Sequence, residues 1–177
     1  MIAYAVTDPS TLDFTTLEYT LKGFSERASM IVYRDTNNTD YAEYARKFLS
    51  SAIDFDKVLL HTDHILAKTL NADGVHLRST QFSDIQDAKS LGLFVVVSTH
   101  TLEEALEAES MGADMLTISP VYKTPNKGTP IGLEGLKKVT SLVTIPVIAL
   151  GGILTQAQIN ACEKAGAKGF ASIRYFA

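Results

Sequence analysis

Gly112-Ala113-Asp114-Met115-Leu116 joins a segment of helical period to a run of apolar residues, and two other stretches repeat its plan. They are Asn71-Ala72-Asp73-Gly74-Val75 and Gly166-Ala167-Lys168-Gly169-Phe170. The Gly or Asn that opens each stretch can adopt the left-handed conformation that ends a helix, and the Ala after it lets the helix approach a sheet closely. Each stretch is therefore predicted to lead from a helix into a strand.

Apolar runs with the length of buried strands continue this plan along the chain. They are rich in Val, Ile and Leu and comprise residues 2–6, 30–33, 57–60, 74–77, 94–98, 115–118, 147–150 and 169–173. Segments of helical period, such as 12–25 and 41–51, separate most of them. Repeated strand and helix units require parallel pairing, and about eight units predict a (β/α)8 barrel, the TIM barrel. An open doubly wound sheet is the alternative.

The size of the chain predicts one barrel domain over residues 1–177. Of the 177 residues 46% are apolar, which suits one core better than two. Barrels usually need about 200 residues or more, and Ala177 follows directly after the eighth strand run. The last helix is therefore expected to be missing or vestigial. Part of the outer face of the eighth strand would then be exposed, and a homodimer would cover it.

Charge and composition exclude several classes of function. Sixteen Lys and Arg against twenty Asp and Glu give a formal charge of −4 and argue against a nucleic-acid surface. No apolar run approaches the roughly 18 residues of a membrane span, and the N-terminus lacks a secretory signal, so a cytoplasmic protein is expected. The single Cys162 is predicted to be a small core residue.

The residues after each strand run are the candidates for chemistry, because barrel enzymes bind ligands at the carboxyl ends of their strands. Gly151-Gly152-Ile153 precedes a helix and could cradle a phosphate with backbone N–H groups, although a purely geometric turn is the alternative. The long loop from Ser119 to Pro130 has the composition of a lid and carries Thr124 and Lys127. A solvated connector is equally compatible with that composition.

Arg34 and the histidines complete this list. The Arg34 guanidinium could contact a phosphate, or it could pair with Asp8 or Asp35 at the rim. His61 and His100 could move protons near neutral pH, whereas His76 is expected to be a hydrogen-bonded structural residue. The histidines and acids have no spacing that predicts a metal site.

The chain resembles the thiamine phosphate synthase/TenI family through an ordered set of motifs. These are Tyr4-x-x-Thr7-Asp8, residues 72–77 (ADGVHL), residues 97–101 (VSTHT), Ser119-Pro120-Val121-Tyr122-x-Thr124-Pro125-x-Lys127, Gly132-Leu133 and residues 148–153 (IALGGI). The resemblance implies a TIM barrel that binds a thiazole phosphate in thiamine synthesis. It places Arg34 and Lys127 near a diphosphate and a pyrimidine, Ser98 and Thr124 in the ligand pocket, and Gly151 and Gly152 on the thiazole phosphate.

The sequence departs from this family at positions that matter for chemistry. On the second strand only Arg34 remains of a Gln-x-Arg-x-Lys pattern, and the family's two magnesium-binding acids are replaced at Thr62 and around Gln81. Pro120 stands where the TenI branch has its proton-shuttling His, and Arg174 stands where the family has a small Ser beside the phosphate. Arg174 is predicted to add a cation to the phosphate site, and the alternative is that its bulk fills that site.

Three functions are compatible with these residues. The first is a TenI-like protein without a metal or other cofactor, which binds a thiazole phosphate and tautomerises it with His61 or His100. The second is a divergent thiamine phosphate synthase, in which Asp8, Asp35 or Asp84 would hold Mg²⁺. The third is a relic of the family that binds a ligand or a partner without catalysis.

Overall fold

The computed structural model describes residues 1–177 and forms a closed barrel of eight parallel strands, each paired with its neighbours in chain order. The strands are β1 (Ile2–Val6), β2 (Met30–Tyr33), β3 (Lys57–His61), β4 (Gly74–Leu77), β5 (Phe94–Thr99), β6 (Met115–Ile118), β7 (Val147–Leu150) and β8 (Gly169–Ser172). Since β1 also pairs with β8, the predicted barrel is confirmed and the open-sheet alternative is wrong.

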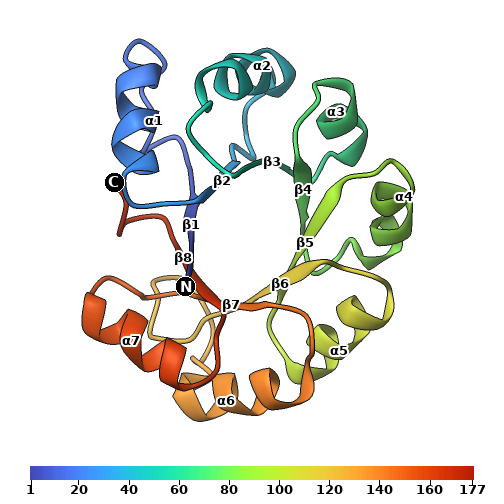
Figure 1. Cartoon of the computed structure of the whole chain (residues 1–177), viewed down its shortest axis with the longest axis vertical. Helices are drawn as coiled ribbons and strands as arrows, with labels where there is room; N and C mark the ends of the chain where they lie inside the picture. The colour runs from blue at the N-terminus through green and yellow to red at the C-terminus, as the bar shows by residue number, and fades with distance from the viewer.

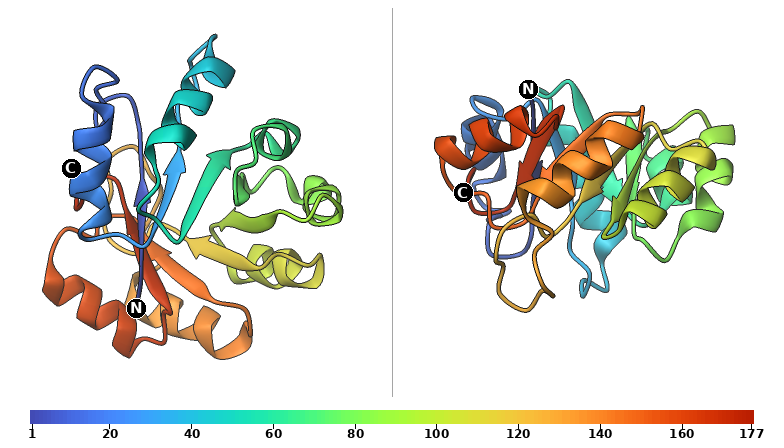
Figure 2. Two further views of the ribbon diagram at one scale, coloured as in Figure 1. Left: turned by 45° about the horizontal axis from the view of Figure 1, so that its top comes forward. Right: turned by 90° about the horizontal axis from the view of Figure 1, so that it is seen from below.

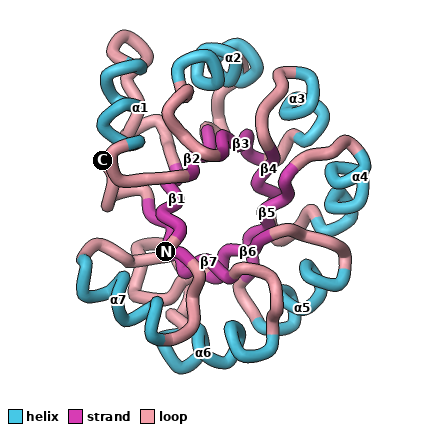
Figure 3. The backbone as a smooth tube through the Cα atoms, in the orientation of Figure 1, coloured by secondary structure: helices cyan, strands magenta, loops and turns pink.

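Helices surround the strands in a single outer ring (Figures 1 and 3). They are α1 (Leu17–Ser25), α2 (Tyr41–Ser51), α3 (His64–Thr69), α4 (Ile85–Ser90), α5 (Leu102–Ser110), α6 (Gly132–Leu142) and α7 (Gln156–Lys164), and a short 3-10 helix, η1 (Phe82–Asp84), precedes α4. None of these helices has both the length and the apolar character needed to cross a membrane.

The three repeated stretches join helices to strands as expected. Asn71, Gly112 and Gly166 adopt positive φ values of 57°, 95° and 94°, which confirms their role as left-handed helix ends. The carboxylates of Asp73 and Asp114 each accept a hydrogen bond from the first part of the preceding strand, at 2.7 and 2.8 Å. These two acids therefore serve the fold and are not free for chemistry.

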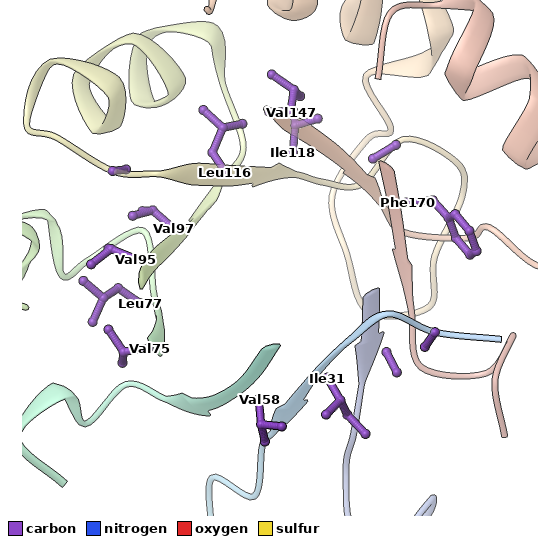
Figure 4. Close-up of a cluster of buried hydrophobic side chains, with 14 of the residues drawn as sticks. Ile31, Val58, Val75, Leu77, Val95, Val97, Leu116, Ile118, Val147 and Phe170 are labelled. Carbon is purple, nitrogen blue, oxygen red and sulfur yellow. The ribbon is translucent and has the colours of Figure 1, made fainter. Parts of the chain in front are cut away.

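Side chains alternate between the two faces of each strand and so build two cores. The outer core lies between strands and helices and includes the ten residues labelled in Figure 4, among them Ile31, Val97 and Phe170. A smaller cluster fills the barrel interior with Tyr4, Val6, Met30, Val32, Leu59, Val96, Met115, Ile148 and Ala171. His61 and Ser98 follow the interior residues Leu59 and Val96 by two positions and so also face inward, and His76 faces inward because its ring is hydrogen-bonded to Tyr4.

The structure corrects the expected helix over residues 12–25, because α1 begins only at Leu17. The Asp13 carboxylate accepts hydrogen bonds from the backbone N–H and the hydroxyl of Thr15 at 2.9 and 2.6 Å, which favours a turn there. In β8 the strand ends at Ser172, so Ile173 lies outside it.

The outer face of β8 is covered, which corrects the expectation that part of it would be exposed. No helix follows β8, but Phe176 stacks on Phe170 with ring centroids 5.6 Å apart, and only 1% of Phe176 is exposed. The guanidinium of Arg27, two residues after α1, donates hydrogen bonds to the carbonyl groups of Tyr175 and Phe176. The reason given for a homodimer is therefore removed, and the dimer itself stays a prediction.

Candidate functional site

A cavity of about 760 Å³ opens at the carboxyl ends of the strands. All nine residues that the sequence marks as candidates line it: Arg34, His61, Ser98, His100, Thr124, Lys127, Gly151, Gly152 and Arg174. The loops after β2 and β6 extend from this end of the barrel (Figure 2, right). The fold therefore brings the candidates into one space, and their roles there stay predictions.

Four cationic side chains line the cavity, and no carboxylate does. Arg34, Arg78, Lys127 and Arg174 come from the ends of β2, β4, β6 and β8 or the loops after them. The two ion pairs of the structure lie on other parts of the molecule, so none of these four cations is neutralised by an acid. A chain with a net charge of −4 thus concentrates positive charge in the cavity at the carboxyl ends of its strands.

Arg34 makes no ion pair at the rim, which overturns the alternative in which it pairs with Asp8 or Asp35. The Asp8 carboxylate accepts hydrogen bonds from Ser10 at 2.5 and 2.9 Å. The Asp35 carboxylate accepts one from the Asn38 amide at 3.2 Å. Both acids are occupied by their own loops, and the half-buried Arg34 side chain is left available to a ligand.

The turn after β7 offers unpaired backbone donors to the cavity. Gly151 and Gly152 have φ values of 101° and 69°, and a Cβ atom on Gly152 would lie 2.8 Å from the carbonyl oxygen of Lys123. Neither glycine donates its backbone N–H within the protein. Geometry therefore requires the glycines, and the same geometry leaves their own N–H groups free in the turn that precedes α7, where they could bind a phosphate.

His61 and His76 form a buried pair of neutral imidazoles at the floor of the cavity. Their ring centroids are 6.0 Å apart, and 8% and 4% of these residues are exposed. Burial, with His76 and Arg34 adding smaller effects, lowers the pKa of His61 to about 3. Burial, followed by Arg34, lowers the pKa of His76 to about 4. A base with so low a pKa accepts protons poorly at neutral pH, so His61 is a weak candidate for a proton shuttle.

His100 has a better arrangement for moving a proton. Its Nδ1 lies 2.8 Å from the carbonyl oxygen of Ser119, which can only accept a hydrogen bond. The proton of the neutral ring therefore sits on Nδ1, and Nε2 keeps its lone pair. His100 is exposed and lines the cavity.

Sequence reasoning missed Arg78 and several polar neighbours that also line the cavity. These neighbours are Thr36, Asn37, Ser79, Thr80 and Ser172. Arg78 directly follows β4, so the rule that marks residues just after each strand would have included it. His76 meets its expectation, since both of its ring nitrogens have hydrogen-bond partners.

The donor groups present do not fit the magnesium ion that the resemblance to synthases implies. No Asp or Glu lines the cavity, and no group of three potential metal ligands exists in the structure. Gln81 uses its amide to donate hydrogen bonds to the carbonyl of Thr62 and to Asp84, both at 3.0 Å. Asp84 is thus held beside Gln81. Asp84, Asp8 and Asp35 all lie outside the cavity lining.

Fold and site together define a (β/α)8 barrel protein whose cavity, at the carboxyl ends of the strands, is lined by four cations and by a glycine turn. The family model described as thiamine monophosphate synthase matches residues 3–176. The chain belongs to this family. A "Putative thiamine-phosphate synthase 2" from Aquifex aeolicus is 36% identical, over 98% of this chain and 96% of its own length.

Two further relatives agree with this assignment. A "Thiamine-phosphate synthase" from Clostridium novyi is 35% identical over 85% of this chain and 78% of its own length. The solved structure of a thiamine phosphate pyrophosphorylase from Pyrococcus furiosus superimposes with a TM-score of 0.82 at 30% identity, covering 97% of this chain and 85% of that one. The family resemblance found in the sequence is therefore confirmed.

Proposed function

We propose that this chain is a divergent thiamine phosphate synthase that binds a thiazole phosphate and a pyrimidine diphosphate in the cationic cavity. The names of its relatives favour this reading over the tautomerase that the sequence placed first. The observation that carries it is the set of four unpaired cations, Arg34, Arg78, Lys127 and Arg174, in a cavity without a carboxylate.

The amount of charge separates the two reactions. A phosphate monoester carries about −1.5 to −2 at pH 7, and a diphosphate adds still more negative charge. The tautomerase substrate, a thiazole carboxylate phosphate, would bring a charge of about −2.5 to −3 and leave part of the positive charge unmatched, whereas the two synthase substrates together would match four cations. The cavity therefore suits a reaction of two anionic substrates.

The reaction requires groups that stabilise a departing diphosphate. The bond between the pyrimidine methylene carbon and the diphosphate oxygen breaks, and the oxygen keeps the electron pair. The ring nitrogen of the thiazole forms the new bond to that carbon. Arg34, Arg78 and Lys127 supply positive charge where negative charge develops, and the turn at Gly151 with Arg174 holds the thiazole phosphate.

The test is to incubate the protein with both substrates in EDTA and to measure diphosphate release. We expect product without added metal, and a loss of about 100-fold in kcat/KM for Arg34→Gln, of the size seen when one transition-state donor is removed. Thr129→Ser, on an exposed part of the β6 to α6 loop outside the cavity lining, is the control and should keep full activity. No product, with or without Mg²⁺, overturns the proposal.

Tautomerisation of a thiazole carboxylate phosphate is the second candidate, favoured by the free Nε2 of His100. It predicts isomer conversion that His100→Gln abolishes. Chromatography of incubations with each substrate set separates the two reactions. Binding of the thiazole phosphate without either product would leave the non-catalytic relic as the remaining function.

A further inference from the structure

A chain of hydrogen bonds runs from the barrel interior to the floor of the cavity. The Tyr4 hydroxyl lies 2.9 Å from His76 Nδ1, and His76 Nε2 lies 2.9 Å from Ser98 Oγ. Tyr4 is completely buried and His76 is nearly so, while Ser98 lines the cavity. The three residues come from β1, β4 and β5, so only the closed barrel brings them together.

The direction of these hydrogen bonds follows from the surroundings of Tyr4. Its hydroxyl has no partner other than His76, and its neighbours in the interior cluster are apolar. Burial raises the pKa of Tyr4 well above its usual value, so this hydroxyl keeps its hydrogen. If His76 Nδ1 donated to the Tyr4 oxygen, the hydroxyl hydrogen of Tyr4 would have no acceptor. An unpaired buried donor costs about 1 to 3 kcal/mol.

Tyr4 therefore donates to Nδ1 of His76. Because burial lowers the pKa of His76 to about 4, the ring is neutral at pH 7 and has one N–H group. That N–H group is on Nε2, and it donates to Ser98 Oγ. The oxygen of Ser98 is then satisfied as an acceptor, and its own hydrogen is free to point into the cavity.

We propose that Tyr4 and His76 are positioning residues that fix Ser98 as a hydrogen-bond donor to the uncharged ring of the ligand. The inference rests on the proposed function for the identity of that ring. The cavity that Ser98 lines also has the buried ring of His61 and the apolar side chains of Val6 and Leu150 in its lining. A heteroaromatic ring with an acceptor nitrogen fits this floor, while the cations of the cavity take its phosphate groups.

The first test is the tautomer of His76 in the free protein, measured by ¹⁵N NMR with His76→Gln used to assign the signals. We expect the hydrogen on Nε2, and in Tyr4→Phe a mixture of tautomers or a hydrogen on Nδ1. A hydrogen on Nδ1 in the unchanged protein would overturn the proposal. This measurement needs no substrate, so its outcome is independent of the proposed function.

The second test compares two probes by calorimetry in EDTA, namely hydroxymethylpyrimidine diphosphate and inorganic diphosphate. Tyr4→Phe should weaken binding of the ring-bearing probe by about 5- to 15-fold, the equivalent of one hydrogen bond, and leave inorganic diphosphate within twofold. Thr117→Val is the matched control. It also removes a buried hydroxyl, but the Thr117 hydroxyl has no hydrogen-bond partner and is not part of the series from Tyr4 to Ser98. Equal losses for both probes would indicate a general structural effect and overturn the proposal.

If neither probe binds the unchanged protein, the proposed function fails, whereas the positioning of Ser98 is still decided by the NMR measurement.

Discussion

At the scale of single residues, the two buried histidines make stability depend on pH. The pKa values of about 3 for His61 and about 4 for His76 lie below the ordinary value of 6.5. Between the ordinary pKa of 6.5 and the lowered pKa of each histidine, the unfolded chain binds protons that the folded chain does not. The free energy of unfolding therefore falls as the pH drops below 6.5. Going from pH 7 to pH 5 should cost about 2 kcal/mol for each histidine.

Urea unfolding at a series of pH values measures this loss. His61→Asn should remove the contribution of one proton to the slope, because Asn does not titrate. A slope that is the same with and without His61 would show that this ring titrates normally in the folded protein.

At the scale of elements, the turn between β7 and α7 depends on the conformation of Gly152. An Ala there would hold a strained φ of 69° and would place its Cβ 2.8 Å from both the Lys123 carbonyl oxygen and Tyr122 Cβ. Gly152→Ala should therefore lower the free energy of unfolding by about 1 to 3 kcal/mol. It should also reduce the rise in melting temperature that a thiazole phosphate produces.

Gly128→Ala is the control for this change, because it lies in the loop that covers the turn and a Cβ there meets nothing within 4 Å. Its stability and its response to the thiazole phosphate should match those of the unchanged protein. If Gly152→Ala destabilises the fold but leaves that response intact, the turn serves geometry alone and the phosphate binds elsewhere.

At the scale of the whole molecule, the sequence predicted the barrel well because its signals are local. Apolar runs and left-handed helix ends located all eight strands, with ends that differ by at most one residue from those observed. The site was predicted as a list of residues after strands, and the fold gathers that list into one cavity. The hydrogen bonds from Tyr4 through His76 to Ser98 could not be predicted from the sequence, because positions 72 and 22 residues apart meet only when the barrel closes.

The difference between local and long-range signals also explains why the outer face of β8 was wrongly expected to be exposed. The last residues of the chain have no helical period, so nothing local shows that Phe176 packs across β8. The Phe176 ring stacks on Phe170 and meets Tyr175 edge to face, with centroids 5.6 and 5.2 Å away, while Arg27, two residues after α1, donates hydrogen bonds to the backbone beside it. These contacts connect the last residues of the chain to the segment that follows the first helix, and Figure 1 shows the C-terminus beside α1.

Phe176→Ala should therefore destabilise the barrel strongly although the residue is next to the end of the chain. Truncating a buried Phe costs about 3 to 5 kcal/mol, and urea unfolding would measure the loss. Tyr19→Ala is the control, because Tyr19 is 85% exposed and should change stability by no more than about 0.5 kcal/mol. Phe176→Ala would also expose the Phe170 ring to solvent, so light scattering should detect self-association of this variant. A loss below about 1 kcal/mol would show that β8 does not need this cover, and its outer face would again be available to a second copy of the chain.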